Sequence, residues 1–218
     1  DGEGDAHATE TLIPIDHNFY SAHNNTPSYS GTSAKDRYLE FVATNGGTQT
    51  QVKEYTNATF TTLVTTQTLP TSAIVYVKGR IYCKGEIGGR VSVVSSDDIV
   101  FDGNISYASG QTHADAGHST AFLAKDKLFF RPDSVSASGI LYAENSSRSS
   151  AAFDAGYNLN WQSDSSKTQL RLYGNRVMNG STNMSIYSDR VYGYDKNLKY
   201  FRPPGLPVRP AVKTVREV

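Results

Sequence analysis

The sequence predicts an all-β fold, specifically a right-handed parallel β-helix (β-solenoid) with an irregular N-terminal segment. The composition is rich in Tyr, Thr, Ser, Val and Gly, with 14 Tyr against 9 Phe, and such residues favour strands with one wet face. Short apolar runs also follow one another, separated by corners of a few residues that carry Gly or Asn. Strands this short would bury little as hairpins, whereas stacked coils share one continuous core.

The N-terminal part of the chain divides into an irregular stretch and the first strands. Residues 1–35 are rich in turn-forming residues and lack a capped, periodic helix pattern. Residues 37–42 read as a strand, the Asn-Gly-Gly sequence at 45–47 predicts a turn, and 50–55 alternate as a returning strand. The Thr-rich stretch 56–68 is β-branched enough to form another strand.

The densest run of short strands begins at residue 73, and from there the sequence predicts successive coils. The segments expected to form these coils are 73–107, 121–142 and 169–194. The polar insertions between them, expected as loops, are 109–119, 144–168 and 179–188. Residues 202–207 hold three prolines and cannot form a ladder strand. We therefore expect two units, an irregular segment 1–35 and a β-solenoid domain 36–218 with a Pro-rich tail.

Charge and hydropathy exclude several classes of function. Lys plus Arg and Asp plus Glu both number 21, so the net charge is zero, which excludes a strongly basic nucleic-acid-binding protein. Mean hydropathy is −0.46, and no apolar run approaches the roughly 20 residues of a spanning helix. The one cysteine, Cys83, cannot form an intrachain disulfide and is expected in the core. The polar composition and the start at Asp1 favour a processed protein of the extracellular space or bacterial cell surface.

Several stretches in order resemble a known family. Residues 74–107 alternate apolar runs with glycine and end in Gly-Asn-Ile-Ser-Tyr, and the segments 170–175, 194–198 and 203–207 follow the family's later motifs. Over about 36–218 the chain resembles the uncharacterised β-helical domain of bacterial secreted and type IV pilus-associated surface proteins. The resemblance implies a right-handed parallel β-helix, export, and association with a cell surface or filament. It implies no known catalysis.

One short loop could bind a metal ion. His113, Asp115 and His118 lie within six residues of a Gly- and Ala-rich stretch, and imidazole and carboxylate groups are ligands for zinc and similar ions. The sequence offers no obvious further strong ligand. The alternative is a solvated loop whose histidines bind nothing.

Acidic residues provide the best case for catalysis. Asp97, Asp98 and Asp102 form a cluster, and paired carboxylates can act as acid and base on polysaccharides. Adjacent residues of a strand point to opposite faces, so Asp97 and Asp98 can share one side only at a corner. The alternative is that their side chains satisfy backbone amides of a turn.

Aromatic side chains suggest a contact surface. We assign possible glycan or protein contacts to Tyr157, Trp161, Tyr187 and Tyr192, because such rings offer apolar area together with a polar group. The alternative is that they are ordinary residues of a sheet surface.

The sequence thus favours a non-enzymatic structural subunit of an extracellular appendage, fibre or pilus-associated assembly, which associates with itself by strand addition at open coil ends. No catalytic residue and no cofactor is assigned in this interpretation. The first alternative is an adhesin or glycan-binding module whose contact surface lies on the loops 144–168 and 179–188. The second is a β-helical polysaccharide-degrading enzyme that uses the aspartates.

Overall fold

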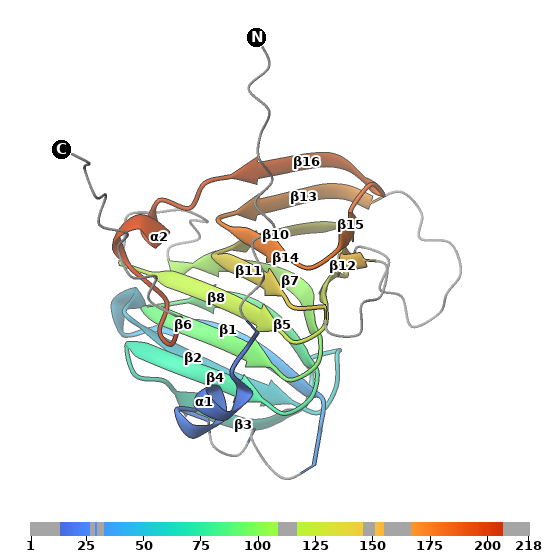
Figure 1. Ribbon diagram of the computed structural model, residues 1–218. Coiled ribbons are helices and arrows are strands. Elements are labelled where there is room, and N and C mark those ends of the chain that lie inside the picture. Colours follow the sequence, from blue (N-terminus) through green and yellow to red (C-terminus); the bar gives the residue numbers. More distant parts are fainter. Residues whose placement is uncertain are drawn as a thin grey trace, which may run out of the picture.

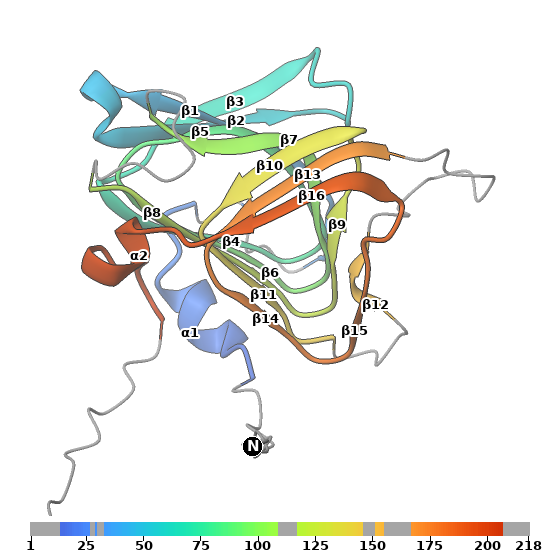
Figure 2. The same cartoon turned by 90° about the horizontal axis from the view of Figure 1, so that it is seen from above.

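The computed structural model describes residues 14–26, 29, 33–108, 117–145, 151–154 and 167–206. Its strands form three sheets that surround a common core (Figures 1 and 2). The five-stranded sheet contains, in spatial order, β14 (Arg176–Met178), β11 (Ile140–Ala143), β8 (Ser119–Ala124), β6 (Arg90–Ser95) and β4 (Ser72–Val77). All of its strand pairs are parallel.

The largest sheet has eight strands and mixed pairing. Its spatial order is β15 (Ser181–Asn183), β12 (Ala151–Asp154), β9 (Leu128–Phe130), β7 (Ile99–Tyr107), β5 (Ile81–Ile87), β1 (Arg37–Thr44), β2 (Gln49–Tyr55) and β3 (Leu63–Thr68). The pairs from β15 to β1 are parallel, whereas β1–β2 and β2–β3 are antiparallel. A third sheet of parallel strands contains β10 (Ser134–Ser138), β13 (Lys167–Tyr173) and β16 (Tyr187–Gly193).

This arrangement confirms the all-β class but contradicts the predicted right-handed parallel β-helix. The eight-stranded sheet is mixed, because the chain reverses after β1 and again after β2. The 3-10 turn η2 (Asn45–Gly47) causes the first reversal, with positive φ values of 50° at Asn45, 64° at Gly46 and 89° at Gly47. Such left-handed residues fold the chain back on itself. The fold is therefore a set of parallel and antiparallel sheets and not a plain β-helix.

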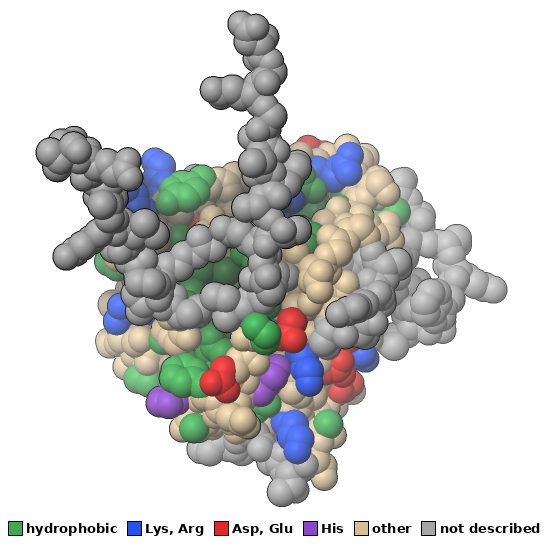
Figure 3. All heavy atoms as spheres, viewed as in Figure 1, with side chains coloured by type: hydrophobic (Ala, Val, Ile, Leu, Met, Phe, Trp, Pro, Cys, Tyr) green, Lys and Arg blue, Asp and Glu red, His purple; other side chains and the backbone are tan. Residues whose placement is uncertain are grey.

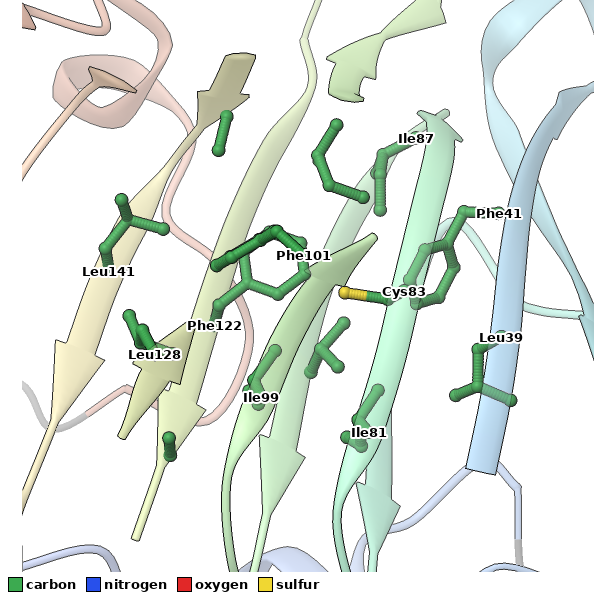
Figure 4. Close-up of a cluster of buried hydrophobic side chains, with 14 of the residues drawn as sticks. Leu39, Phe41, Ile81, Cys83, Ile87, Ile99, Phe101, Phe122, Leu128 and Leu141 are labelled. Atoms are coloured by element: carbon green, nitrogen blue, oxygen red, sulfur yellow. The ribbon is translucent and has the colours of Figure 1, made fainter. Parts of the chain in front are cut away.

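The core consists of side chains that lie in register on successive strands. Ile81, Ile99 and Leu128 occupy one row across β5, β7 and β9, and the row beside it runs through Cys83 and Phe101. Phe101 packs against Phe122 of the five-stranded sheet, with ring centroids 5.0 Å apart, and Figure 4 shows these side chains meeting between the sheets. Parallel strands with both faces covered read as near-continuous apolar runs, as 74–77 and 99–101 do. The prediction that Cys83 is buried is confirmed, and burial raises the pKa of its thiol.

A tight backbone contact explains one pair of corner glycines. Gly174 has φ of +126°, and a Cβ at that position would lie 2.0 Å from the carbonyl oxygen of Gly139. Gly139 itself has φ of +118°. Only glycine accommodates both the positive φ and the close approach of two stacked corners.

The N-terminal segment contains a short helix that the sequence did not predict. α1 (His17–Ala22) is capped by the Asp16 side chain, which accepts a hydrogen bond from Phe19 N at 3.0 Å. Tyr20 packs on the outer face of the five-stranded sheet, and its hydroxyl donates to the carbonyl of Gly205 near the other end of the described chain. A second short helix, α2 (Asn197–Tyr200), precedes this C-terminal stretch. Figure 3 shows positive, negative and apolar side chains interspersed on the face that carries α1.

Two of the predicted loops contain strands. β12 lies inside the segment 144–168, and β15 lies inside 179–188. β15 is short and holds no apolar residue, and β12 has four residues inside a segment rich in Ser, Asn and Asp, so the composition of each segment indicated a loop. Their place is set by parallel pairing with neighbouring strands, which a sequence pattern of three or four residues does not reveal.

Candidate functional site

The three sheets all finish, at one end of the molecule, in strands that lie close to the C-terminus in sequence. These strands are β14, β15 and β16, which we call the terminal rung; β16 is the outermost strand at the top of Figure 1. All residues of β15 are exposed, and Tyr187 is the one buried residue of β16. No strand within the described part of the chain pairs with the outer edges of the terminal rung. Edges of this kind present rows of N–H and C=O groups to a partner.

A cation–π pair closes the core at the terminal rung. Arg176 is in register with buried Leu141, and Tyr192 is in register with buried Leu172, so both side chains project from the core-facing side of their strands. The Arg176 guanidinium lies 3.9 Å from the centroid of the Tyr192 ring. Tyr192 remains 44% exposed. The apolar core is therefore covered by side chains that tolerate water, while no described strand pairs with the backbone edges beside them.

The opposite end of the five-stranded sheet is covered. Two side chains act as a substitute for a neighbouring strand along the edge of β4: Asn25 Oδ1 accepts from Ile74 N at 2.7 Å, and Asn24 Oδ1 accepts from Tyr76 N at 2.9 Å. Asn25 N in turn donates to the Ile74 carbonyl at 2.8 Å. These bonds use groups of β4 that would otherwise be open to a partner, so the two ends of this sheet differ.

The eight-stranded sheet also has an open edge, at β3. Five of the six residues of β3 are exposed, and Leu63 and Val64 expose 52% and 56% of their surface. The chain carries no charged side chain between Glu54 and Lys78. Natural proteins usually protect an edge strand with Lys, Pro or a covering segment. Among the described residues, β3 has none of these along its six positions.

The predicted acidic pair lies at a corner between β6 and β7, where Asp97 and Asp98 do come to one side. Their carboxylates and that of Asp126 lie within 4.8 Å of one another. Arg80 supplies the positive charge for this group: its Nη2 lies 2.6 Å from Asp98 Oδ2 and 4.0 Å from Asp97 Oδ2. Asp98 Oδ1 also accepts from Lys127 N at 3.1 Å. The buried Asp98 carboxylate therefore binds a guanidinium and a backbone amide of the protein. This agrees with the alternative that the aspartate side chains satisfy backbone amides at a corner.

Burial and the neighbouring Arg80 charge shift the pKa of Asp98 in opposite directions. Desolvation raises the pKa of this carboxyl group, and Arg80 offsets only part of the increase. Asp102, the third predicted acid, lies apart on β7 and pairs with Arg131 at 3.3 Å. Its pKa is also raised, mainly by burial. The three predicted aspartates thus belong to two separate groups, Asp97 and Asp98 beside Arg80 and Asp102 beside Arg131.

Of the predicted metal ligands, the structure describes His118, while His113 and Asp115 lie outside the described residues. His118 is buried, and its Nδ1 accepts a hydrogen bond from Gly89 N at 2.9 Å. Desolvation lowers the pKa of this imidazole. Through the hydrogen bond from Gly89 N, the ring links the starts of the neighbouring strands β6 and β8. The metal site stays a prediction.

The predicted aromatic contacts divide in a similar way. Tyr157 and Trp161 lie outside the described residues. Tyr187 is buried, and its hydroxyl lies 2.7 Å from the carbonyl of Pro132, so this ring belongs to the core. Tyr192 is exposed at the terminal rung. A contact role for these four residues stays a prediction.

Sequence reasoning missed three of these features, namely Arg80 as the partner of Asp98, the cover formed by Asn24 and Asn25, and the open edge of β3. The first two depend on strand register, which the sequence does not display. The third had a signal, the absence of charge along a β-branched segment.

Comparisons with known proteins identify no relative: no family model, curated protein or solved structure matches the chain. The resemblance to the pilus-associated family therefore stays a prediction. No helix in the described ranges is long and apolar enough to cross a membrane.

Proposed function

We propose that this chain is a non-enzymatic structural subunit of a bacterial extracellular assembly, an appendage, fibre or pilus-associated surface structure. In this proposal, a neighbouring subunit adds an extended segment to the terminal rung. The observation that carries the proposal is the contrast between the two ends of the five-stranded sheet. One end is covered by side-chain hydrogen bonds from Asn24 and Asn25, whereas the terminal rung has no such cover within the described residues.

Strand addition suits this surface chemically. Main-chain hydrogen bonds supply affinity to an added strand, and the side chains beside the edge supply specificity. At the terminal rung, the specific elements are the Arg176–Tyr192 pair and the exposed side chains of β16. A partner seated there would meet a cation and an aromatic ring together, a combination frequent in protein interfaces.

The described acidic corner supports a structural role over catalysis. Asp98 is held by Arg80 and by the amide of Lys127, and Asp102 is held by Arg131. A polysaccharide hydrolase needs two carboxylates free to exchange protons across a bound sugar. Here the buried carboxylates are engaged by cations and amides of the protein itself.

The direction of the backbone groups in β16 allows a selective test. Gly174 N donates to the carbonyl of Gly193 at 2.8 Å, so Gly193 faces β13. In a parallel ladder alternate residues face the same neighbour, and the N–H groups of Arg190 and Tyr192 therefore face away from β13. Arg190→Pro removes one outward N–H and places a ring at the edge without breaking the ladder. Arg190→Ala removes the same side chain and keeps the N–H.

The experiment compares the wild type with these two variants by sedimentation velocity and negative-stain electron microscopy over a concentration series. We expect wild type and Arg190→Ala to form species larger than a dimer, and Arg190→Pro to lose them while its circular dichroism spectrum stays native. A wild type that never exceeds a dimer at millimolar concentration would refute the proposal, as would an Arg190→Pro variant that assembles like Arg190→Ala.

A further inference from the structure

The edge of β3 is an unusual surface for a protein in water. Both faces of the strand are largely open, since Thr65 and Thr66 are both exposed and adjacent strand residues point to opposite faces. Gln67 is the one partly buried residue of the strand, and its side chain donates a hydrogen bond to the Asn25 carbonyl. Burial of side chains therefore does not explain why β3 is uncharged. Among the residues that the structure describes, hydrogen bonds to another strand hold β3 on one side only, where it pairs with β2.

The pairing with β2 fixes which backbone groups of β3 point outward. Leu69 N donates to the Thr50 carbonyl at 2.8 Å, and the register continues through Val52↔Gln67 and Glu54↔Thr65. In an antiparallel ladder these alternate positions exchange hydrogen bonds with the neighbour. The residues between them, Thr66 and Thr68, accordingly turn their N–H and C=O groups away from β2, whereas the register shifts at Val64, which has no partner on β2.

We infer that this edge binds a second copy of the chain through a two-fold axis at Thr66, with β3 antiparallel to β3 of the partner copy. In that register Thr66 lies opposite Thr66 of the other copy, and Thr68 lies opposite the bulge position Val64. Cross-strand Thr–Thr pairs are favourable. The contact continues the antiparallel order of β1, β2 and β3.

Electrostatics permits a second copy here more readily than at β16. A two-fold contact sets identical residues against each other, and β3 has no charge that would be doubled. The charged residue directly beside Thr66 is Lys53, which lies on β2 and is the register partner of Thr66. Two copies of Lys53 would be separated by three strand spacings, about 14 Å, which exceeds the screening length of about 8 Å at physiological ionic strength. In β16, by contrast, Asp189 and Arg190 occupy the strand itself.

A two-fold contact also gives a closed dimer. One edge of each copy is used and no uncharged edge remains exposed, whereas a head-to-tail contact would leave one at the end of every chain of subunits. The strand offers six residues, fewer than the roughly 20–30 residues a side of a stable interface. We therefore expect a weak dimer in solution that becomes effective when subunits are already held together.

This inference deepens the proposed function and rests on it for its place in an assembly: the terminal rung supplies one junction and β3 supplies a second. The two can fail separately. Arg190→Pro silences the terminal rung, so the β3 contact is measured in that background. If the wild type stops at a dimer, the fibre proposal fails while the β3 contact stands.

The experiment is sedimentation equilibrium of Arg190→Pro alone and combined with Thr66→Pro, Thr66→Ala or Thr66→Lys. Thr66→Pro removes an outward N–H without touching the pairs to β2, and Thr66→Ala is its matched control. We expect Arg190→Pro and its Thr66→Ala form to dimerise, and Thr66→Pro to weaken dimerisation at least tenfold. Thr66→Lys keeps the N–H but sets two charges face to face, so its dimer should return at high salt.

Two outcomes would overturn the inference. The first is an Arg190→Pro chain that stays monomeric at millimolar concentration, which would also mean that any occupant of β3 is a different protein. The second is a natively folded Thr66→Pro form that dimerises as tightly as Thr66→Ala. If Thr66→Pro does not fold, the salt-dependent Thr66→Lys form decides the question: a dimer as tight as that of Thr66→Ala at low salt would equally refute the contact.

Discussion

Two adjacent aspartates allow a direct test of whether the acidic corner is structural. Asp98 is 7% exposed, lies 2.6 Å from Arg80, and accepts the amide of Lys127. Asp97 is 46% exposed and 4.0 Å from the same guanidinium. We expect Asp98→Asn to destabilise the fold and Asp97→Asn to have little effect, although the two substitutions make the same chemical change.

The magnitudes follow from burial. Removing one partner of a buried ion pair costs about 3–5 kcal/mol because it leaves an uncompensated charge. Arg80 is 28% exposed, so water screens part of its charge, and the new Asn can still accept from Lys127 N. The substitution also relieves the desolvation that raises the pKa of Asp98. Together these effects place the cost of Asp98→Asn at about 1–2 kcal/mol. An exposed pair such as Asp97–Arg80 contributes about 0–1 kcal/mol.

Urea denaturation followed by far-ultraviolet circular dichroism measures both costs, and an Arg80→Gln background completes a double-mutant cycle. In the Arg80→Gln background Asp98→Asn should cost less, because it no longer leaves the Arg80 guanidinium without its partner. Equal free energies of unfolding for Asp97→Asn and Asp98→Asn would refute the structural reading of the corner. So would a cost of Asp98→Asn that Arg80→Gln leaves unchanged.

Two further predictions concern the corners of the sheets. Gly174→Ala should cost about 3–5 kcal/mol of stability, because the position combines a positive φ with the close backbone contact at Gly139. Gly46→Ala should cost about 1–2 kcal/mol, because Gly46 has a positive φ but open space around it. Equal urea denaturation midpoints for the two variants would contradict this. Because burial lowers the pKa of His118, its contribution to stability is complete above pH 6.5 and is lost as the pH falls from there through the folded pKa, by up to about 1.4 kcal/mol per pH unit. Urea titrations between pH 7.5 and 5 should show a shallower fall in His118→Asn than in the wild type, and identical slopes would argue against it.

The sequence identified local elements better than their assembly. The strand, turn and returning strand at 37–55 were predicted correctly, because Asn45, Gly46 and Gly47 need the positive φ values that they adopt. Burial of Cys83 followed from its apolar neighbours. The architecture was wrong because the coil interpretation placed residues 36–218 in one solenoid, whereas the hairpin at 37–55 joins the parallel strands in a single mixed sheet.

Features that depend on register could not be predicted. The condition that Asp97 and Asp98 share a side only at a corner was sound, but Arg80 lies 18 positions from Asp98 and meets it only because the strands stack. Asn24 and Asn25 read as turn residues, and their bonds to β4 span about fifty residues of chain. α1 has six residues, too few for a helical period to stand out.

The two open edges differ in what an added strand would gain. Backbone groups at an edge in water are already hydrogen-bonded to solvent, so each bond made to a partner yields only about 0.5–1.5 kcal/mol. The inferred β3 contact makes two such bonds at Thr66 and at most four more beside it, a gain of roughly 1–9 kcal/mol against an association cost of about 4–15 kcal/mol. One edge alone is therefore marginal. A subunit that uses the terminal rung and β3 together pays the association cost of the second contact at high effective concentration, which is how two weak edges can hold an assembly that neither edge could hold alone.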